Sequence, residues 1–257
     1  MSQHPHVHHH AHGPKRWTAY LGEFLMLFLA VTLGFFVENY REQTVERHRE
    51  HVVMRQVLED LRADRQRADS NLALRRWRAA KMDSLLAIHA GRAITAHAPE
   101  VYYFGQMVRN RYLFQPSTGA FAQLENGGGL RLIDNVAVLR AIQQYHFAVE
   151  QLLSMQALEE DQIQRYRNGA LLRLLDPSVV RRITHQDIEE LDKRVDRPEA
   201  TVRLLAADPA TLNEFFMQVS NMESFNKTAT RLVTGLAATA DSVAAVITRT
   251  YGFDAKE

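Results

Sequence analysis

Cysteine is absent from the sequence, which excludes disulfide bonds, thiolate metal sites and cysteine nucleophiles. An excess of one charge is also absent, since 31 Lys and Arg residues face 30 Asp and Glu residues. Without an overall basic surface, we expect no nucleic-acid partner. No segment alternates apolar and polar residues over the length of a strand, so we expect no β-sheet. The rest is an ordinary globular composition of 257 residues, 46% of them hydrophobic, which is enough chain for a folded core.

Catalytic and metal-binding motifs are also missing. Residues 48–51 read HREH, but their two histidines are three apart, whereas an HExxH zinc site needs them four apart. The adjacent acids Glu159 and Glu160 belong to different faces of a helix and lack the histidine spacing of di-iron bundles. The sequence therefore predicts a protein that is not an enzyme and has no cofactor and no metal site.

The first 16 residues form a histidine-rich tail that reads MSQHPHVHHHAHGPKR. Neutral imidazole binds zinc, copper or nickel, but nothing in this tail fixes a geometry that would select one metal. The prolines and glycine argue against regular structure. We therefore expect residues 1–16 to be disordered and to capture metal only adventitiously.

A long apolar run near the N-terminus indicates a membrane-spanning helix. Residues 17–37 read WTAYLGEFLMLFLAVTLGFFV and contain a single charge, Glu23. At about 1.5 Å per residue the run spans about 31 Å, close to the roughly 30 Å hydrocarbon core of a bilayer. Tyr20 and Tyr40 lie near its two ends, like the aromatic belts of membrane interfaces. No small-x-small cleavage site follows, so we expect an anchor over residues 17–38 rather than a signal peptide.

Glu23 is the unusual residue of this run, because a carboxylate at the centre of a membrane helix costs roughly 2.5–3.5 kcal/mol on insertion scales. Ala30 and Gly34 follow on the same helical face, and such small-xxx-small pairs let helices approach closely. We therefore predict helix–helix packing at Glu23, Ala30 and Gly34 in a homo-oligomer. One alternative is a channel with Glu23 facing an ion path. The other is a Glu23 that is hydrogen-bonded near the headgroups of a helix surrounded by lipid.

The charges that flank the run give two answers about orientation. Lys15 and Arg16 precede it with no acid before them, whereas the residues after it alternate Arg with Glu. Lys and Arg alone would place the large domain in the cytoplasm, whereas net charge keeps the N-terminus inside. We favour the second orientation, in a bacterial inner membrane with the large domain on the periplasmic side.

After the apolar run the pattern predicts helices only. Residues 40–89 contain no proline or glycine, and their apolar residues recur at steps of three, four and seven, which indicates an amphipathic stalk helix. Its charges of mixed sign are interpreted as a solvated face. From Asp208-Pro209, a cap followed by proline, a heptad pattern extends to about residue 249. Asn226 is the central polar residue of its seam, and we expect it to be hydrogen-bonded inside the core.

Shorter helices are expected between these two. Asp134 or Asn135 can cap a helix that begins near residue 136, and Asp176-Pro177 is expected to end the helical stretch before it. Thr184-x-x-Asp187 resembles a capping box for a short helix to about residue 195.

Aromatic residues are concentrated between residues 102 and 121. We consider two roles for them: a ligand pocket or docking surface, and rings that simply pack into the core. The residues concerned are Tyr102, Tyr103, Phe104, Tyr112, Phe114 and Phe121.

Two segments, about half of the chain with the spacing between them, carry a resemblance. In residues 20–42 a Gly-Glu pair precedes the apolar run, a late glycine follows, and an Asn-Tyr pair forms the exit. In residues 114–146 a Leu-Gly-Leu-Ile-Asn pattern surrounds a helix break. The matching residues are Gly22, Glu23, Gly34, Asn39, Tyr40, Leu124, Gly128 or Gly129, Leu132, Ile133 and Asn135. In these features the chain resembles an uncharacterised family of bacterial single-pass membrane-anchored helical proteins. The resemblance implies architecture only, because the family has no assigned activity to transfer.

Together these patterns predict an all-α protein with three parts: a tail over residues 1–16, a transmembrane helix over 17–38, and a helical domain over 39–257. In that domain a long stalk helix leads into an antiparallel bundle of about four helices. The leading hypothesis is a non-enzymatic, membrane-anchored protein that self-associates or scaffolds an unidentified protein partner. The alternatives are the ion-conducting assembly and a ligand-sensing bundle that uses the aromatic residues.

Overall fold

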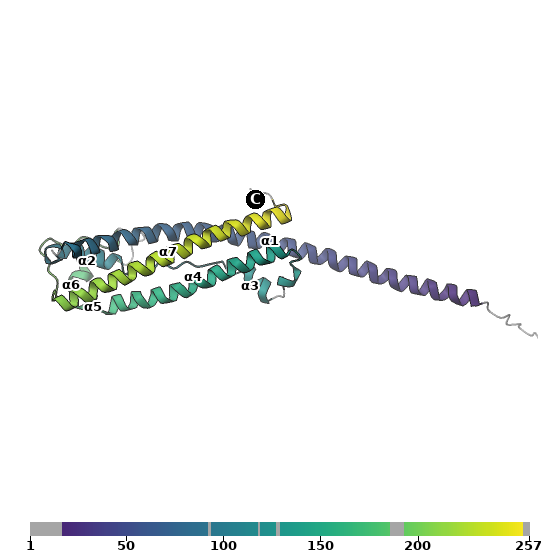
Figure 1. The fold of residues 1–257 in the computed structure, drawn as a ribbon, viewed down its shortest axis with the longest axis horizontal. Coiled ribbons are helices and arrows are strands. Elements are labelled where there is room, and N and C mark those ends of the chain that lie inside the picture. Colours follow the sequence, from purple (N-terminus) through teal and green to yellow (C-terminus); the bar gives the residue numbers. More distant parts are fainter. Residues whose placement is uncertain (1–16, 92–93, 118, 127–128, 186–192, 254–257) are drawn as a thin grey trace, which may run out of the picture. The chain divides into compact units, whose positions relative to one another are not determined.

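The computed structural model describes residues 17–91, 94–117, 119–126, 129–185 and 193–253, and the predicted tail of residues 1–16 lies outside them. Every regular element in the described part is helical, and an isolated antiparallel bridge joins Thr184 to Val195. The all-α prediction is therefore confirmed. The helices, labelled in Figure 1, are α1 (Trp17–Ala90), η1 (Ile94–His97), α2 (Ala98–Met107), α3 (Gly119–Asn126), η2 (Gly129–Leu132), α4 (Val136–Asn168), α5 (Ala170–Leu174), α6 (Pro177–Ile183) and α7 (Pro209–Tyr251).

The chain divides into two compact units, Met1–His51 and Val52–Glu257. In the first unit, α1 contains an 18-residue window with a mean hydropathy of 2.0, and none of that window is buried. Among the described residues, α1 and α7 are long and apolar enough to cross a membrane. In α7, however, the apolar seam packs inside the second unit, as expected for a core helix.

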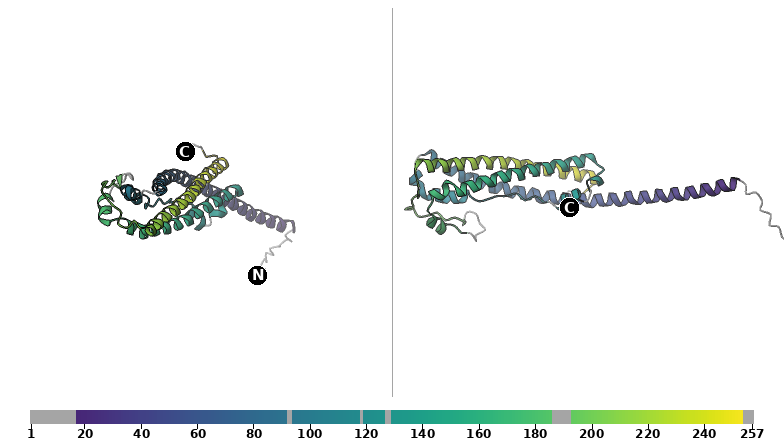
Figure 2. Two further views of the ribbon diagram at one scale, coloured as in Figure 1. Left: turned by 60° about the vertical axis from the view of Figure 1, so that its left-hand side comes forward. Right: turned by 90° about the horizontal axis from the view of Figure 1, so that it is seen from below.

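The second unit is built on three long helices: α1 from Val52 onward, α4 and α7, which lie side by side in Figures 1 and 2. Helices α1 and α4 run parallel, because residues with higher numbers in α1 contact residues with higher numbers in α4. The Tyr145 hydroxyl donates to Asp64 (2.6 Å), and further along Arg75 donates to Glu159 (2.9 Å). A parallel neighbour requires the intervening chain to return along the bundle.

Helix α7 is antiparallel to both. Arg65 of α1 meets Asp241 of α7 at 2.9 Å, whereas Arg78, further along α1, meets Asn226, which comes earlier in α7, at 2.9 Å. The α7 seam is buried over most of its length, which confirms the heptad prediction.

The return from α1 to α4 is not a helix. Residues 108–117 have no regular secondary structure and run back beside α1. The carbonyl oxygen of Tyr112 accepts from Asn71 (3.0 Å), and further along the backbone N–H of Ser117 donates to Asp64 (2.8 Å). The expected bundle of about four antiparallel helices is therefore wrong in this detail. Within the described residues, side chains from the long helices satisfy this backbone in place of helical hydrogen bonds.

Most predicted helix starts are confirmed by their caps. The side chain of Asn135 accepts from the backbone N–H groups of Ala137 and Val138, and Asp208 does the same at the start of α7. Asp176-Pro177 begins α6 as well as ending α5, because the Asp176 carboxylate accepts from the Ser178 N–H at 2.8 Å. Thr184, the first residue of the expected capping box, is extended and bridges to Val195, and the capping box itself stays a prediction. Residues 186–192 of that expected helix lie outside the described part.

Candidate functional site

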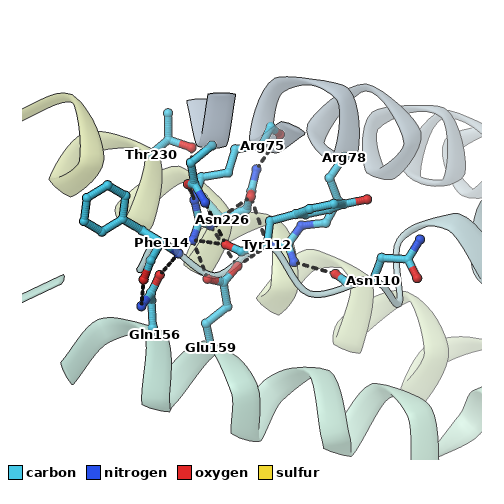
Figure 3. Close-up of polar contacts among 10 residues, drawn as sticks. Arg75, Arg78, Asn110, Tyr112, Phe114, Gln156, Glu159, Asn226 and Thr230 are labelled. Carbon is cyan, nitrogen blue, oxygen red and sulfur yellow. Dashed lines mark hydrogen bonds and ion pairs between the residues drawn. The ribbon is translucent and has the colours of Figure 1, made fainter. Parts of the chain in front are cut away.

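A polar network occupies the middle of the second unit, where the three long helices meet (Figure 3). Arg75 and Arg78 of α1 are both fully buried. Arg75 grips the carboxylate of Glu159 from α4 with two hydrogen bonds, Nη1 to Oε1 at 3.0 Å and Nη2 to Oε2 at 2.9 Å. Arg78 also donates to Oε1 of Glu159. Two-pronged pairing of this kind is the strongest geometry for an arginine and a carboxylate.

Helix α7 contributes Asn226 to the same network. Its side-chain oxygen accepts from Arg78 (2.9 Å) and Arg75 (3.4 Å), while its Nδ2 donates to the backbone carbonyl of Arg75 (3.1 Å). The expectation that Asn226 is hydrogen-bonded in the core is confirmed. All three long helices are thus joined at one level by polar side chains.

The network also holds the non-helical return segment. Arg75 donates to the carbonyl of Tyr112 (3.2 Å) and Arg78 to the carbonyl of Asn110 (3.3 Å). Gln156, one helical turn before Glu159, pairs with both backbone groups of Phe114: it accepts from N–H (2.6 Å) and donates to the carbonyl (3.2 Å). Buried backbone without such partners would be costly. These side chains therefore make the non-helical segment possible.

The electrostatics of the network are unbalanced, with two guanidinium groups facing one carboxylate. Burial lowers the pKa of Arg78, and the charge of Arg75 adds to that effect while Glu159 opposes it. Burial alone would raise the pKa of Glu159, but the hydrogen bonds and charges of Arg75 and Arg78 outweigh it, so the pKa is lowered. Since both arginines are fully buried, the network can hold the helices together but cannot meet a substrate from solution.

A groove elsewhere in the same unit is lined by residues of α2, α5 and α6, among others. These three helices gather at one end of the unit (Figure 1). The volume of the groove is about 1110 Å³. Leucine and valine side chains of α5, α6 and the residue between them supply an apolar lining, and four basic side chains border it. Those four are Arg109, Arg167, Arg181 and His185.

The arginines of the groove have neutral partners. Arg167 donates to the backbone carbonyl of Arg109 through Nε (3.2 Å) and Nη2 (2.7 Å). Arg109 in turn donates to the side-chain oxygen of Gln106 at 2.6 Å. Burial lowers the pKa of Arg167, and the charges of Arg109 and Arg111 lower it further. Positive charge is therefore concentrated on this side of the groove.

No family model, no curated protein and no solved structure matches this chain. The resemblance drawn from the sequence stays a prediction, and the candidate sites rest on geometry alone.

The three residues predicted to pack membrane helices lie together on α1. Glu23, Ala30 and Gly34 are all exposed in the first unit, and a Cβ atom added at Gly34 would meet nothing within 4 Å. That face is therefore open to a neighbouring helix, and the contact itself stays a prediction.

The structure does not bring the six aromatic residues together. Tyr102 belongs to the core cluster beneath α5 and α6, whereas Phe114 belongs to a different cluster in the middle of the bundle. Tyr103 and Phe104 are half-buried beneath the guanidinium of Arg197. Phe121, at the other end of the unit, stacks on a histidine of α4 with ring centroids 4.1 Å apart. Tyr112 is buried beside Arg78. The described rings thus contribute to separate parts of the core and surface.

The HREH segment was considered in the sequence as a metal site. His48 and His51 are exposed on α1. Within the described residues, no group of three or more His, Asp and Glu side chains is placed to hold a metal ion.

Sequence reasoning missed the network because it treated the charges of residues 40–89 as a solvated face. A heptad step shows otherwise. Positions 54, 61, 68, 75 and 82 are all buried, and Arg75 stands in line with Met54, Leu61, Ala68 and Met82. The same step along the second seam, from Val57 to Leu85, passes through three more buried polar residues, Asp64, Asn71 and Arg78. Strict heptad spacing could have placed these residues inside the bundle.

Proposed function

We propose that this chain is a non-enzymatic, single-pass membrane protein whose α1 anchors a helical domain and self-associates in the bilayer. The observation that carries the proposal is the exposure of the apolar part of α1. Large side chains there are half or more exposed, among them Phe24 (63%), Phe28 (56%) and Phe35 (71%). Each would contribute about 1.5–3 kcal/mol if removed from water. A continuous apolar surface of this size requires lipid or another protein to cover it.

The proposed location is a bacterial inner membrane, with the large domain on the periplasmic side. The absence of cysteine permits a direct test of this orientation. Arg140 is exposed on α4, so a single Arg140→Cys variant gives one thiol in the large domain. A membrane-impermeant maleimide should label it in intact spheroplasts. Labelling only after lysis would reverse the orientation, and recovery of the protein in the soluble fraction would refute the anchor.

Self-association is tested within the same helix. Ala30 shares the face of Glu23 and Gly34, whereas Thr32 lies on the opposite face at nearly the same depth. Under mild oxidation in membranes, Ala30→Cys should form disulfide-linked dimers and Thr32→Cys should not. Equal cross-linking of the two variants would indicate random collision. No cross-linking of Ala30→Cys, together with a monomeric mass by light scattering, would refute both self-association and the channel alternative.

Ligand sensing is the second candidate function, and the groove favours it. The volume of about 1110 Å³ slightly exceeds the roughly 300–1,000 Å³ usual for small-molecule sites. The aromatic residues considered in the sequence as a ligand pocket lie elsewhere, since none of the six is among the residues that line this groove.

A further inference from the structure

We propose that the groove bounded by α5 and α6 binds a small amphipathic anion, a carboxylate or phosphate attached to an aliphatic chain. The inference rests on the ligand-sensing candidate and names its ligand class, and it is independent of the membrane proposal because it concerns residues of the second unit alone. It rests on the joint presence of uncompensated arginines and an apolar lining in one concave surface.

The basic side chains of the groove indicate that the ligand has an anionic head. Arg109 and Arg167 are engaged with neutral oxygen atoms, one of a side chain and one of the backbone. Arg181 is exposed on α6, and no described carboxylate forms an ion pair with any of the three. Guanidinium groups bind carboxylate and phosphate oxygens in pairs. An anion here would gain such contacts without breaking an ion pair.

Described acids beside the lining residues already have partners, and the Asp176 carboxylate, for example, accepts from the Ser178 N–H at 2.8 Å. Arg111 pairs with Glu160 (3.3 Å), and His185 contacts Asp196 (2.7 Å). Both acids are thus already engaged beside the groove. Among the described residues that line the groove, the ionisable side chains are all basic.

The leucines of the groove indicate that the ligand has an aliphatic chain. Leu171, Leu172 and Leu175 all line the groove; the first and last are almost fully buried, whereas Leu172 is 64% exposed. Val180 of α6 is a further apolar lining residue. An exposed leucine at a concave apolar surface is covered at little cost by a ligand chain, which would contribute about 0.8 kcal/mol for each buried CH₂ group.

Thr184 adds a neutral hydrogen-bonding group. It lines the groove, and its hydroxyl oxygen is buried with no hydrogen-bond partner among the described residues. Buried hydroxyl groups without a partner are uncommon. A carboxylate or phosphate oxygen in the groove would provide one.

The test is a calorimetric titration of the full chain in nanodiscs of zwitterionic phosphatidylcholine, with empty nanodiscs as the blank. Octanoate and octyl phosphate are the probes, and 1-octanol is the neutral control of the same length. We expect saturable one-to-one binding of at least one anion and none of the alcohol. Binding of the alcohol as tight as that of the anions would overturn the assignment of an anionic head.

Neighbouring arginines of α6 provide a matched pair of variants. Arg181 lines the groove and Arg182 does not, although both are exposed. Arg181→Gln should weaken binding about tenfold, as expected for the loss of one charge-assisted hydrogen bond, and Arg182→Gln should leave it unchanged. Neither variant removes a core contact, so both should keep the thermal transition of the wild type. Equal effects of the two, or no saturable binding of either anion, would overturn the proposal.

A second arm separates the two sources of such an anion. If the natural occupant is the headgroup and chain of an anionic phospholipid, nanodiscs containing phosphatidylglycerol should abolish octanoate binding. If it is a free anion, binding should persist in them. The Ala30→Cys cross-link involves other residues, so failure of the membrane proposal and failure of the groove proposal are distinguishable.

Discussion

Replacing Glu159 by glutamine should destabilise the second unit strongly, although the two side chains have nearly the same size. The change preserves shape but removes the one carboxylate that faces Arg75 and Arg78. Glu159 accepts two hydrogen bonds from Arg75 and one from Arg78, whereas the glutamine amide would present NH₂ to one of these donors. Both arginines are fully buried, and leaving a buried charge without its partner costs about 3–5 kcal/mol. For a domain of roughly 200 residues this corresponds to a fall in Tm of about 6–20 °C.

The neighbouring acid supplies the control. Glu160 pairs with Arg111 at 3.3 Å, with side chains 30% and 50% exposed, and such exposed pairs contribute about 0–1 kcal/mol. Circular dichroism at 222 nm on the full chain in nanodiscs would compare Glu159→Gln with Glu160→Gln. A difference between the two variants of less than about 1 °C would refute the argument that the charge is buried and structurally required.

The difference in Tm between the wild type and Glu159→Gln should depend on pH. The pKa of Glu159 is lowered in the folded protein, because the two arginines outweigh the effect of burial. Its stabilisation is therefore complete above the usual glutamate pKa and is lost as the pH falls through the lowered value. The wild type and Glu159→Gln should accordingly converge in Tm at low pH and diverge as the pH rises towards neutrality. Parallel Tm curves would contradict the lowered pKa.

Three further changes probe other parts of the second unit. Tyr145→Phe removes the hydroxyl that donates to Asp64 at 2.6 Å; we expect a loss of about 1–3 kcal/mol in denaturant unfolding, and no loss would contradict a stabilising role for that bond. Asp208→Ala removes the cap of α7 and should cost about 1 kcal/mol, which amide exchange would report as faster opening at the start of that helix. Phe215→Ala empties a fully buried site beneath α5 and should cost about 3–5 kcal/mol, measurable by the shift of the denaturation midpoint; an unchanged midpoint would place the ring outside the core.

Local pattern was sufficient for the parts of the fold that depend on one helix. The cap at Asp208 and the α7 seam follow from spacing alone, because each depends on residues within a few turns. The same is true of the apolar run of α1. These elements were predicted with their approximate bounds.

The non-helical return segment could not be found in this way. Its backbone is satisfied by Asn71, Gln156 and the two buried arginines, which are about 30 to 40 residues distant in sequence. The groove likewise joins Arg109, Arg167 and Arg181 from three separate stretches. No local pattern encodes such meetings, because they exist only after the helices have packed.

Stability alone does not explain why the polar network is buried, since buried ion pairs are often less stabilising than apolar residues of the same volume. The position of the network offers an answer. Along α4, residues one heptad before and after Glu159 are Leu152 and Tyr166, both buried. Along α7, the residues one heptad from Asn226 are Val219 and Val233, also buried. If α1 slid by one heptad against either helix, the arginines would face apolar side chains and lose their hydrogen bonds. An apolar seam repeating every seven residues would accept such a shift at far smaller cost. The polar network therefore selects one register of the helices among several that apolar burial alone would make nearly equal in free energy.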